Sequence, residues 1–203
     1  MTPRQLSEPR TRSSFRAKLL RWYDRNRRDL PWRQTKDPYR IWVSEIMLQQ
    51  TRVGAVLDHY RRWFERFPTV NALARAREQS VLAAWSGLGY YRRARNLYAA
   101  AKVVALEREG KFPETTDGLR ELPGIGRYTA AAIASIAFGD RAAVVDSNVE
   151  RVLQRLTGNA DLSNGATWEL AQALIAPERP GDFNQAMMEL GATVCLPRDP
   201  KCL

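Results

Sequence analysis

The chain has 203 residues, of which 44% are hydrophobic and 9% aromatic, so it can bury a core as one domain or two small ones. Its 32 basic and 22 acidic residues give a formal charge of +10, which favours a polyanionic partner, with nucleic acid as the leading candidate. The sequence shows no apolar run of membrane-spanning length, no secretory signal and only two cysteines. We therefore expect a soluble, cytoplasmic protein without a disulfide scaffold.

The positive charge is concentrated near the N-terminus. Residues 1–40 contain 12 basic and 4 acidic side chains, whereas the other 163 residues carry a surplus of only two positive charges. Only five of the basic residues are Lys, and the planar guanidinium of Arg is well suited to binding phosphate. We expect little fixed structure in residues 1 to about 12, and we expect the first helix after them to carry the positive field.

Apolar side chains recur at helical spacing along most of the chain. The first stripe runs from Phe15 to Tyr23, and Asp37-Pro38, a cap residue followed by proline, begins a second helix that continues through Met47. Further helices are predicted at residues 53–64, 78–86, 92–109, 128–138, 148–157, 167–176 and 182–194. No segment shows the sustained alternation of a strand, so the predicted fold is all-α.

The segment 119–132, LRELPGIGRYTAAA, places a Pro-Gly-Ile-Gly turn between two helical patterns. Pro123 ends the first helix, while Gly124 and Gly126 permit unusual backbone angles and let N–H groups approach a ligand closely. These groups precede the helix through Tyr128, where the helix dipole favours an anion. The turn fits a DNA phosphate, which is contacted without reading base sequence. A plain connection between two helices is the alternative.

From about residue 15 onward the chain resembles the helix-hairpin-helix DNA glycosylases, and among them the adenine DNA glycosylases of the MutY type. The resemblance rests on LPWR at 30–33, SEIMLQQT at 44–51, GLGYYRRARNL at 87–97, LPGIGRYTAA at 122–131 and VVDSNVERVL at 144–153. It implies two helical lobes with a DNA-binding cleft between them. Residues 30–140 would form one lobe, and the N-terminal helix within 1–29 would pack with residues 141–203 to form the other.

Two carboxyl groups are the candidate catalytic groups. From the pattern alone, Asp146 is an ordinary helix N-cap, and Glu45 is either an exposed residue of a half-buried helix or a buried carboxyl with a raised pKa. The resemblance implies that Asp146 stabilises an oxocarbenium-like sugar, while Glu45 protonates the adenine ring and later helps to activate water. A neutral acid and a charged stabiliser would then lie on opposite walls of the cleft.

The resemblance also assigns supporting roles. Superfamily members that nick the DNA backbone carry a Lys in the hairpin helix, which forms a Schiff base with the sugar. That position is Tyr128 here, so we predict base excision without an efficient lyase step. Tyr128 and Asn148 match residues that support the catalytic Asp. The residues expected to contact DNA are Arg33, Gln49, Gln50, Tyr91, Gly124, Gly126 and Arg127. For Tyr91 and its neighbour Tyr90, a buried aromatic pair is the alternative.

Two cysteines near the end of the sequence, Cys195 and Cys202, are separated by six residues in CLPRDPKC. In the family, this spacing begins a four-cysteine site for a [4Fe-4S] cluster, and two of those four ligands are present here. The family also carries a further C-terminal domain that recognises 8-oxoguanine opposite adenine. The sequence given is therefore expected to be a truncated chain with a partial cluster site.

The resemblance, taken with these features, implies a monomeric DNA N-glycosylase that works on duplex DNA in the bacterial cytoplasm, at the nucleoid. It would hydrolyse the N-glycosidic bond of adenine mispaired with 8-oxoguanine or guanine, after the base has swung out of the duplex. One alternative is an endonuclease III-type pyrimidine-lesion glycosylase with lyase activity, against which Tyr128 argues. The other is a non-enzymatic DNA-binding module in which Glu45 and Asp146 are structural.

Overall fold

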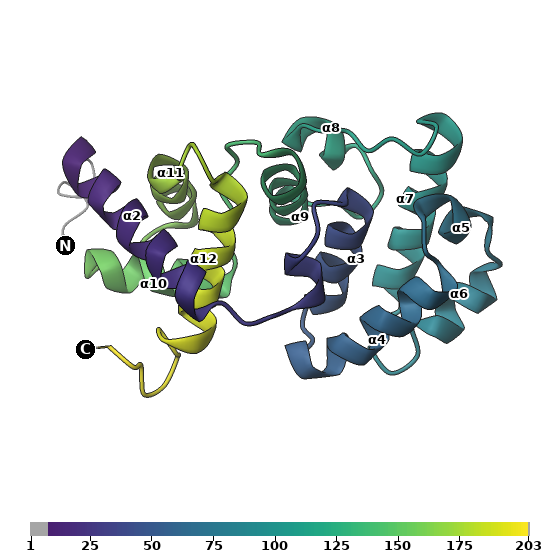
Figure 1. Ribbon diagram of the computed structural model, residues 1–203, viewed down its shortest axis with the longest axis horizontal. Coiled ribbons are helices and arrows are strands. Elements are labelled where there is room, and N and C mark those ends of the chain that lie inside the picture. The colour runs from purple at the N-terminus through teal and green to yellow at the C-terminus, as the bar shows by residue number, and fades with distance from the viewer. Residues whose placement is uncertain (1–7, 203) are drawn as a thin grey trace. The chain divides into compact units, whose positions relative to one another are not determined.

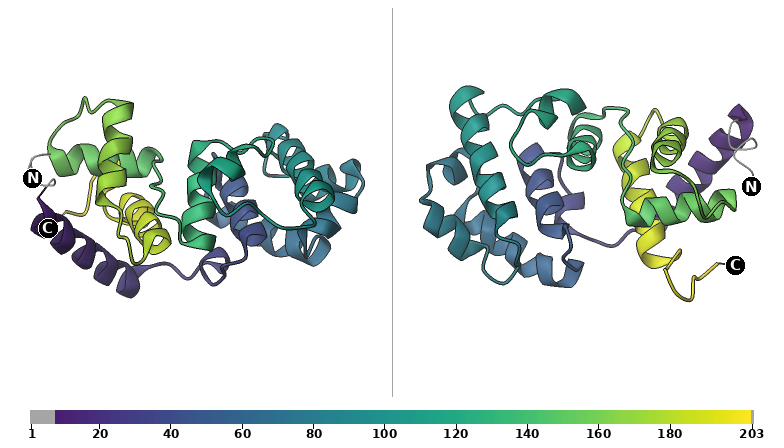
Figure 2. Two further views of the ribbon diagram at one scale, coloured as in Figure 1. Left: turned by 90° about the horizontal axis from the view of Figure 1, so that it is seen from above. Right: turned by 180° about the vertical axis from the view of Figure 1, so that it is seen from behind.

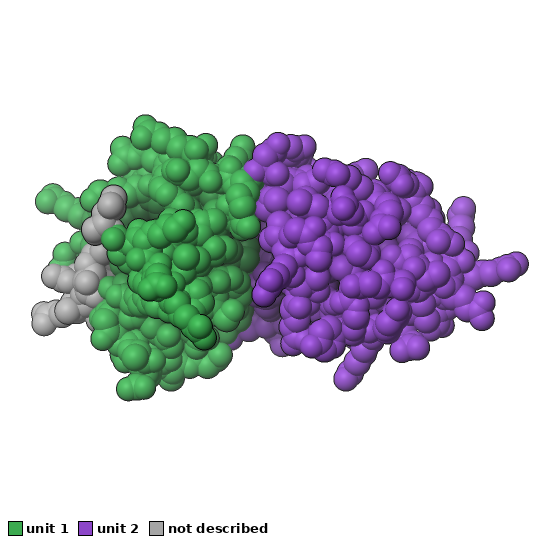
Figure 3. All heavy atoms as spheres, turned by 90° about the horizontal axis from the view of Figure 1, so that it is seen from below, with its two compact units in different colours: residues 1–28, 139–203 green, residues 29–138 purple. Residues whose placement is uncertain are grey.

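The structure, a computed structural model, describes residues 8–202, and within that range it contains helices and connecting loops but no strand (Figure 1). The predicted all-α fold is confirmed. The chain divides into two compact units, unit 1 with residues 1–28 and 139–203 and unit 2 with residues 29–138 (Figure 3). No helix in residues 8–202 is both long enough and apolar enough to cross a membrane.

Unit 2 carries most of the helices. In chain order they are η1 (Pro31–Arg33), α3 (Pro38–Leu48), α4 (Val53–Arg66), α5 (Val70–Arg75), α6 (Glu78–Ala84), α7 (Arg92–Glu107), α8 (Thr116–Arg120), α9 (Arg127–Ile133) and the π-helical turn η2 (Ala134–Phe138). The elements η1 and α5 have three and six residues, too few to show a helical period in the sequence, and they were not predicted. A helix ending at Pro123 was predicted, and the corresponding α8 is present but ends earlier, at Arg120.

Helix α3 is the centre of unit 2 and packs against α4, α7 and α9. It is buried from Tyr39 to Met47, except for Arg40. Its start is fixed by Asp37, whose side chain accepts a hydrogen bond from the Tyr39 amide at 2.9 Å. The Tyr39 hydroxyl accepts from the Trp63 indole at 3.2 Å and donates to the Phe67 carbonyl at 3.0 Å. A helix held in this way is a rigid support for the side chains it carries.

Unit 1 is formed by α2 (Pro9–Asn26), α10 (Ser147–Thr157), α11 (Asn164–Leu174) and α12 (Pro180–Thr193). Helix α2 packs against α12, and α12 packs against α10 (Figures 1 and 2). The expectation of little structure up to residue 12 was wrong for residues 9–12, where Pro9 at the first helical position begins α2; residues 1–7 lie outside the described range. Glu189, fully buried, accepts three hydrogen bonds from Arg28 and so ties the end of α2 to α12.

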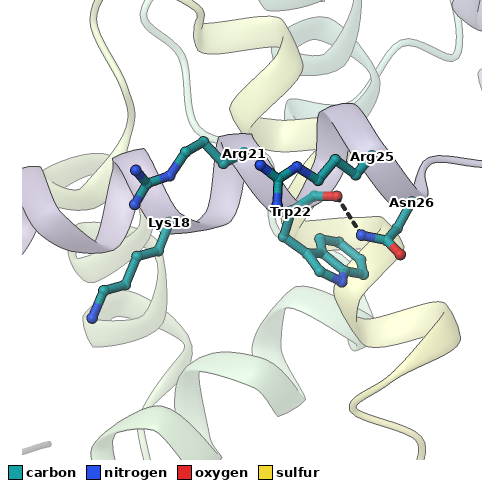
Figure 4. Close-up of a pocket in the computed structure, with 5 residues that line it drawn as sticks. All are labelled: Lys18, Arg21, Trp22, Arg25 and Asn26. Atoms are coloured by element: carbon teal, nitrogen blue, oxygen red, sulfur yellow. Dashed lines mark hydrogen bonds between the residues drawn. The ribbon is translucent and has the colours of Figure 1, made fainter.

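One side of α2 is basic and contains a shallow hollow of about 400 Å³, lined by Lys18, Arg21, Trp22, Arg25 and Asn26 (Figure 4). The Asn26 side chain donates to the Trp22 carbonyl at 2.8 Å. No ion pair joins Lys18, Arg21 or Arg25 to another residue in the described part of the chain. These three cations lie on one face of the helix because their spacing of three and four residues matches the helical repeat.

Candidate active site

The Glu45 carboxyl is buried in α3, with 6% of the residue exposed. The Tyr128 hydroxyl, from the first turn of α9, donates a hydrogen bond to Glu45 Oε2 at 2.8 Å. The two residues are 83 positions apart, and they meet because α3 packs against α9. Burial disfavours the charged carboxylate, whereas the hydrogen bond from Tyr128 favours it. The sequence motifs SEIMLQQT and LPGIGRYTAA thus form one site in unit 2.

The segment after Glu45 leads directly into the connection between α3 and α4. Gln49 lies at the end of α3, and its side-chain amide donates to the Thr129 hydroxyl of α9 at 3.4 Å. Gln50 is exposed and has a φ of 56°, a left-handed conformation that is uncommon for a residue with a side chain. Both glutamines therefore lie in a short, well-defined loop beside the hairpin.

The hairpin itself consists of α8, the turn 121–126 and α9. Gly124 has a φ of +74°, and a Cβ added there would lie 2.5 Å from the Asn96 Cβ, so no other residue fits. Gly126 has ordinary angles, φ −87° and ψ 178°, and its Cβ would point into open space. The prediction of unusual backbone angles was thus correct at Gly124 and wrong at Gly126. Arg127 follows as the exposed first residue of α9.

Asp146 is the N-cap of α10 in unit 1, and each of its carboxyl oxygens accepts a hydrogen bond. Oδ1 accepts from the Val149 amide at 2.8 Å, and Oδ2 accepts from the Asn148 side-chain amide at 2.9 Å. Asn148 is held in turn by Arg151, which donates to its Oδ1 at 2.8 Å. Gly191 leaves room for Asn148, because a Cβ there would lie 2.6 Å from the Asn148 Cβ. The predicted cap is present, and it fixes the orientation of the carboxyl group.

The two cysteines lie at the end of unit 1. Cys195 is buried, its carbonyl accepts from Arg151 Nε at 2.8 Å, and its sulfur lies 3.4 Å from Arg155 Nη1. Cys202 is exposed, and both thiols are free. Within residues 8–202, no group of three His, Cys, Asp or Glu side chains could hold a metal ion. Two thiols do not fit a cluster that takes four cysteine ligands, so we assign no step of a reaction to it.

The remaining predicted contacts lie on the surface of unit 2. Arg33 is partly exposed at the end of η1, and Tyr90 and Tyr91 are 65% and 40% exposed in the loop before α7. A buried aromatic pair at Tyr90 and Tyr91 is therefore excluded. Sequence reasoning missed Arg93, whose guanidinium contacts both this loop and the end of α3. The only signal was the run of arginines in GLGYYRRARNL, which does not show which of them turns toward the interior.

The sequence and structure are similar to those of DNA repair proteins. The profile of the HhH-GPD superfamily base excision DNA repair proteins matches residues 43–177. The adenine DNA glycosylase of Rattus norvegicus is 50% identical over 94% of this chain and 40% of its own length. That of Buchnera aphidicola (from Acyrthosiphon pisum) is 38% identical over 95% of this chain and 57% of its own. The chain thus spans about half, or less, of the length of these relatives.

Two solved structures extend the comparison. A thermostable thymine-DNA glycosylase superposes with a TM-score of 0.86 and 35% identity, covering 94% of this chain and 90% of its own. An endonuclease III trapped in a covalent intermediate with DNA superposes with a TM-score of 0.82 at 24% identity, covering 100% and 92%, and shows the shared fold. The helical fold and the hairpin define a helix-hairpin-helix protein. The chain belongs to the HhH-GPD superfamily of base excision DNA repair proteins.

Proposed function

We propose that this chain is the catalytic part of a monomeric DNA N-glycosylase that removes adenine mispaired with 8-oxoguanine or guanine from duplex DNA. The observation that carries the proposal is the buried Glu45 carboxyl with the Tyr128 hydroxyl bound to it. A carboxyl group in a rigid helix, shielded from water, is suited to act as a general acid on a base that has left the duplex. The names of the relatives, adenine DNA glycosylases, supply the target base.

The proposed reaction is a hydrolysis. Glu45 gives its proton to a ring nitrogen of the everted adenine, and the bond between C1′ and N9 breaks with its electron pair leaving on the base. The Asp146 carboxylate stabilises the positive charge that develops on the sugar. Water then adds to C1′, its proton passes to Glu45, and the products are free adenine and an abasic site. The proposal requires Glu45 of unit 2 and Asp146 of unit 1 to face the same nucleotide.

In this proposal, Tyr128 distinguishes base release alone from base release with strand cutting. A phenol that donates to a carboxyl cannot form a Schiff base with the sugar, whereas a lysine amine can. The enzyme should therefore release the base without cutting the strand. Trapping of a stoichiometric covalent adduct with borohydride would contradict this part of the proposal.

The proposed DNA contacts combine anchoring with insertion into the duplex. Gly124, Gly126 and Arg127 would hold a phosphate at the start of α9, because the open side of Gly126 lets the backbone approach the strand closely. Gln49, Gln50 and Tyr91 would fill the space that the everted base leaves, and Arg33 would lie near the base pocket. Such contacts are a physical requirement of any enzyme that extrudes a base.

The test is base release under single-turnover conditions from duplexes containing A opposite 8-oxoguanine, A opposite G, T opposite G, an oxidised thymine, or no lesion. Free adenine from the first two duplexes supports the proposal. The 35% identity to a thymine-DNA glycosylase makes thymine release from T opposite G the second candidate. Release of oxidised thymine with strand cutting would indicate the endonuclease III-type reaction. Binding without release from any duplex would indicate a DNA-binding module.

A further inference from the structure

Arg93, the second residue of α7, is the most extensively bonded side chain near the proposed DNA-binding loops. Its Nη1 donates to the backbone carbonyls of Ile46 at 2.9 Å and Met47 at 3.1 Å, and also to the carbonyl of Gln49. These carbonyls belong to the C-terminal end of α3, where the helix dipole favours a cation. Arg93 therefore caps the helix that carries Glu45.

The other terminal nitrogen of Arg93 contacts two loops at once. Nη2 donates to the Thr51 hydroxyl at 3.3 Å, to the Leu88 carbonyl at 2.9 Å and to the Gly89 carbonyl at 3.3 Å. The guanidinium carbon also lies 5.3 Å from the ring centre of Trp85 and 5.5 Å from that of Tyr90. One side chain thus connects the loop 49–51 with the loop 87–91.

Both loops contain a residue in a conformation that side chains rarely adopt. Gln50 has a φ of 56° and Tyr90 a φ of 46°. Such conformations persist only where the surrounding structure holds them, and they are concentrated at functional sites. Tyr90 and Gln50 are both exposed, and the Tyr90 ring lies against the Arg93 guanidinium. Other bonds hold one loop each, from the Trp85 indole to the Gly89 carbonyl at 3.0 Å and from Gln49 to Thr129 at 3.4 Å, whereas Arg93 bonds to both loops.

We propose that Arg93 is a positioning residue that holds the loops 49–51 and 87–91 in the conformation in which they enter the duplex. This inference rests on the proposed function, since it assumes that the target base is everted. Loops that are already ordered lose less conformational freedom when DNA binds, so more of the binding free energy remains for unstacking the base. Lysine cannot replace Arg93, because a single ammonium group lacks the planar fork that reaches both loops.

The test compares Arg93→Lys with Arg92→Lys, the same chemical change at an exposed neighbour that holds neither loop. A duplex with 2-aminopurine beside the target adenine reports unstacking as a rise in fluorescence. Single-turnover release is measured from adenine opposite 8-oxoguanine and from adenine opposite an abasic-site analogue, where eversion costs less. Arg93→Lys should reduce the fluorescence rise and slow release from the paired duplex by about tenfold to a hundredfold. Release from the unpaired adenine should slow by less than about threefold, since little unstacking is needed there.

The outcome that overturns the inference is equal slowing of Arg93→Lys on both duplexes, or no slowing on either. Equal slowing would mean that Arg93 acts on Glu45 or on folding, and an unchanged fluorescence rise would mean that the loops do not depend on it. If Arg93→Lys does not fold, Thr51→Val decides the question, because it removes one acceptor of the Arg93 fork and leaves the guanidinium in place. Thr51→Val should also slow release from the paired duplex more than release from the unpaired adenine, by a smaller factor. If it does not, the inference is overturned.

The proposed function and the inference fail in different ways. If the unmodified chain releases no base but its fluorescence rise depends on Arg93, the proposed function is wrong and the positioning role stands. The other case is that adenine is released while neither Arg93→Lys nor Thr51→Val slows release more from the paired duplex than from the duplex with an abasic-site analogue. In that case the proposed function stands and the positioning role is wrong.

Discussion

At the scale of single residues, Asp146 combines a structural and a proposed chemical role in one carboxyl group, and Asp146→Asn separates them. The amide keeps an oxygen that can accept from the Val149 amide, so α10 should still be capped. The negative charge is lost, and release of adenine should fall by at least about a hundredfold, the usual effect of removing one electrostatic contact to a transition state. Single-turnover release and DNA affinity are the measurements.

The control is Asp37→Asn, which changes another helix-capping aspartate in the same way. Release by this control should stay within about twofold of the unmodified chain, since asparagine caps a helix about as well as aspartate. DNA affinity should be retained in both variants. Turnover that survives in Asp146→Asn would exclude the proposed mechanism.

Tyr128→Phe tests the hydrogen bond to Glu45. The change removes the hydroxyl that lies 2.8 Å from Glu45 Oε2 and leaves this buried oxygen without that donor. Losing such a bond costs about 1–3 kcal/mol, so adenine release should slow by roughly tenfold to a hundredfold. Tyr98→Phe is the matched control, because it removes a 2.6 Å bond to the Ala76 carbonyl elsewhere in unit 2. A control that slows release as much as Tyr128→Phe would assign the effect to stability, which thermal unfolding of both variants measures.

The candidate residues could be named from the sequence, but most of their contacts could not. Glu45 and Asp146 follow from ordered motifs, and the capping role of Asp146 follows from its position before a helix. The bond between Tyr128 and Glu45 spans 83 positions and exists only because two helices pack together. Likewise, Arg92 and Arg93 are equivalent in the sequence, and only the fold decides which one faces the interior.

At the scale of elements, the length of a helix decides whether the sequence reveals it. The stripes at residues 53–64 and 148–157 predict α4 and α10 to within about two residues, because several turns repeat the same apolar face. The five-residue α8 shows no full period, although it forms half of the hairpin. The predicted helix 128–138 ends in the π-helical turn η2, and the Lys36 ammonium donates to its Ile136 carbonyl at 2.9 Å.

The hairpin offers a paired prediction, because its two glycines have different environments. Gly124→Ala forces a Cβ against Asn96 at a φ of +74°, so the free energy of unfolding should fall by about 1–3 kcal/mol. Gly126→Ala meets open space at an ordinary φ and should leave stability unchanged. It should nevertheless weaken DNA binding, because the new methyl group would lie between the backbone and a phosphate. Chemical denaturation and DNA titration distinguish the two effects, and unchanged affinity in Gly126→Ala would exclude close contact of this turn with DNA.

At the scale of the whole molecule, Glu45 lies in unit 2 and Asp146 lies in unit 1. The boundaries at 28/29 and 138/139 differ by one or two residues from those expected from the resemblance. The composition of the chain could not have shown that α2 packs in the same unit as α10, α11 and α12. That grouping depends on Leu19 and Tyr23 packing with Leu153 and Leu174 in a single core. The positive charge, in contrast, could be read directly from the sequence, and Lys18, Arg21 and Arg25 of α2 carry part of the surplus.

The last prediction concerns this charge. Binding to duplex DNA should weaken as salt rises, with a slope of log affinity against log salt of about −0.9 for each phosphate neutralised. Replacing Lys18, Arg21 and Arg25 of α2 by Gln should make the slope shallower by about one for each phosphate that is no longer neutralised. Replacing Arg61, Arg62 and Arg66 of α4 removes the same net charge from exposed positions and serves as the control. Equal changes in slope for the two variants would show that DNA affinity depends on the net charge of the chain and not on where that charge lies. A change confined to the α2 variant, with adenine release at saturating DNA unaffected, would show that α2 binds the strand outside the reacting site.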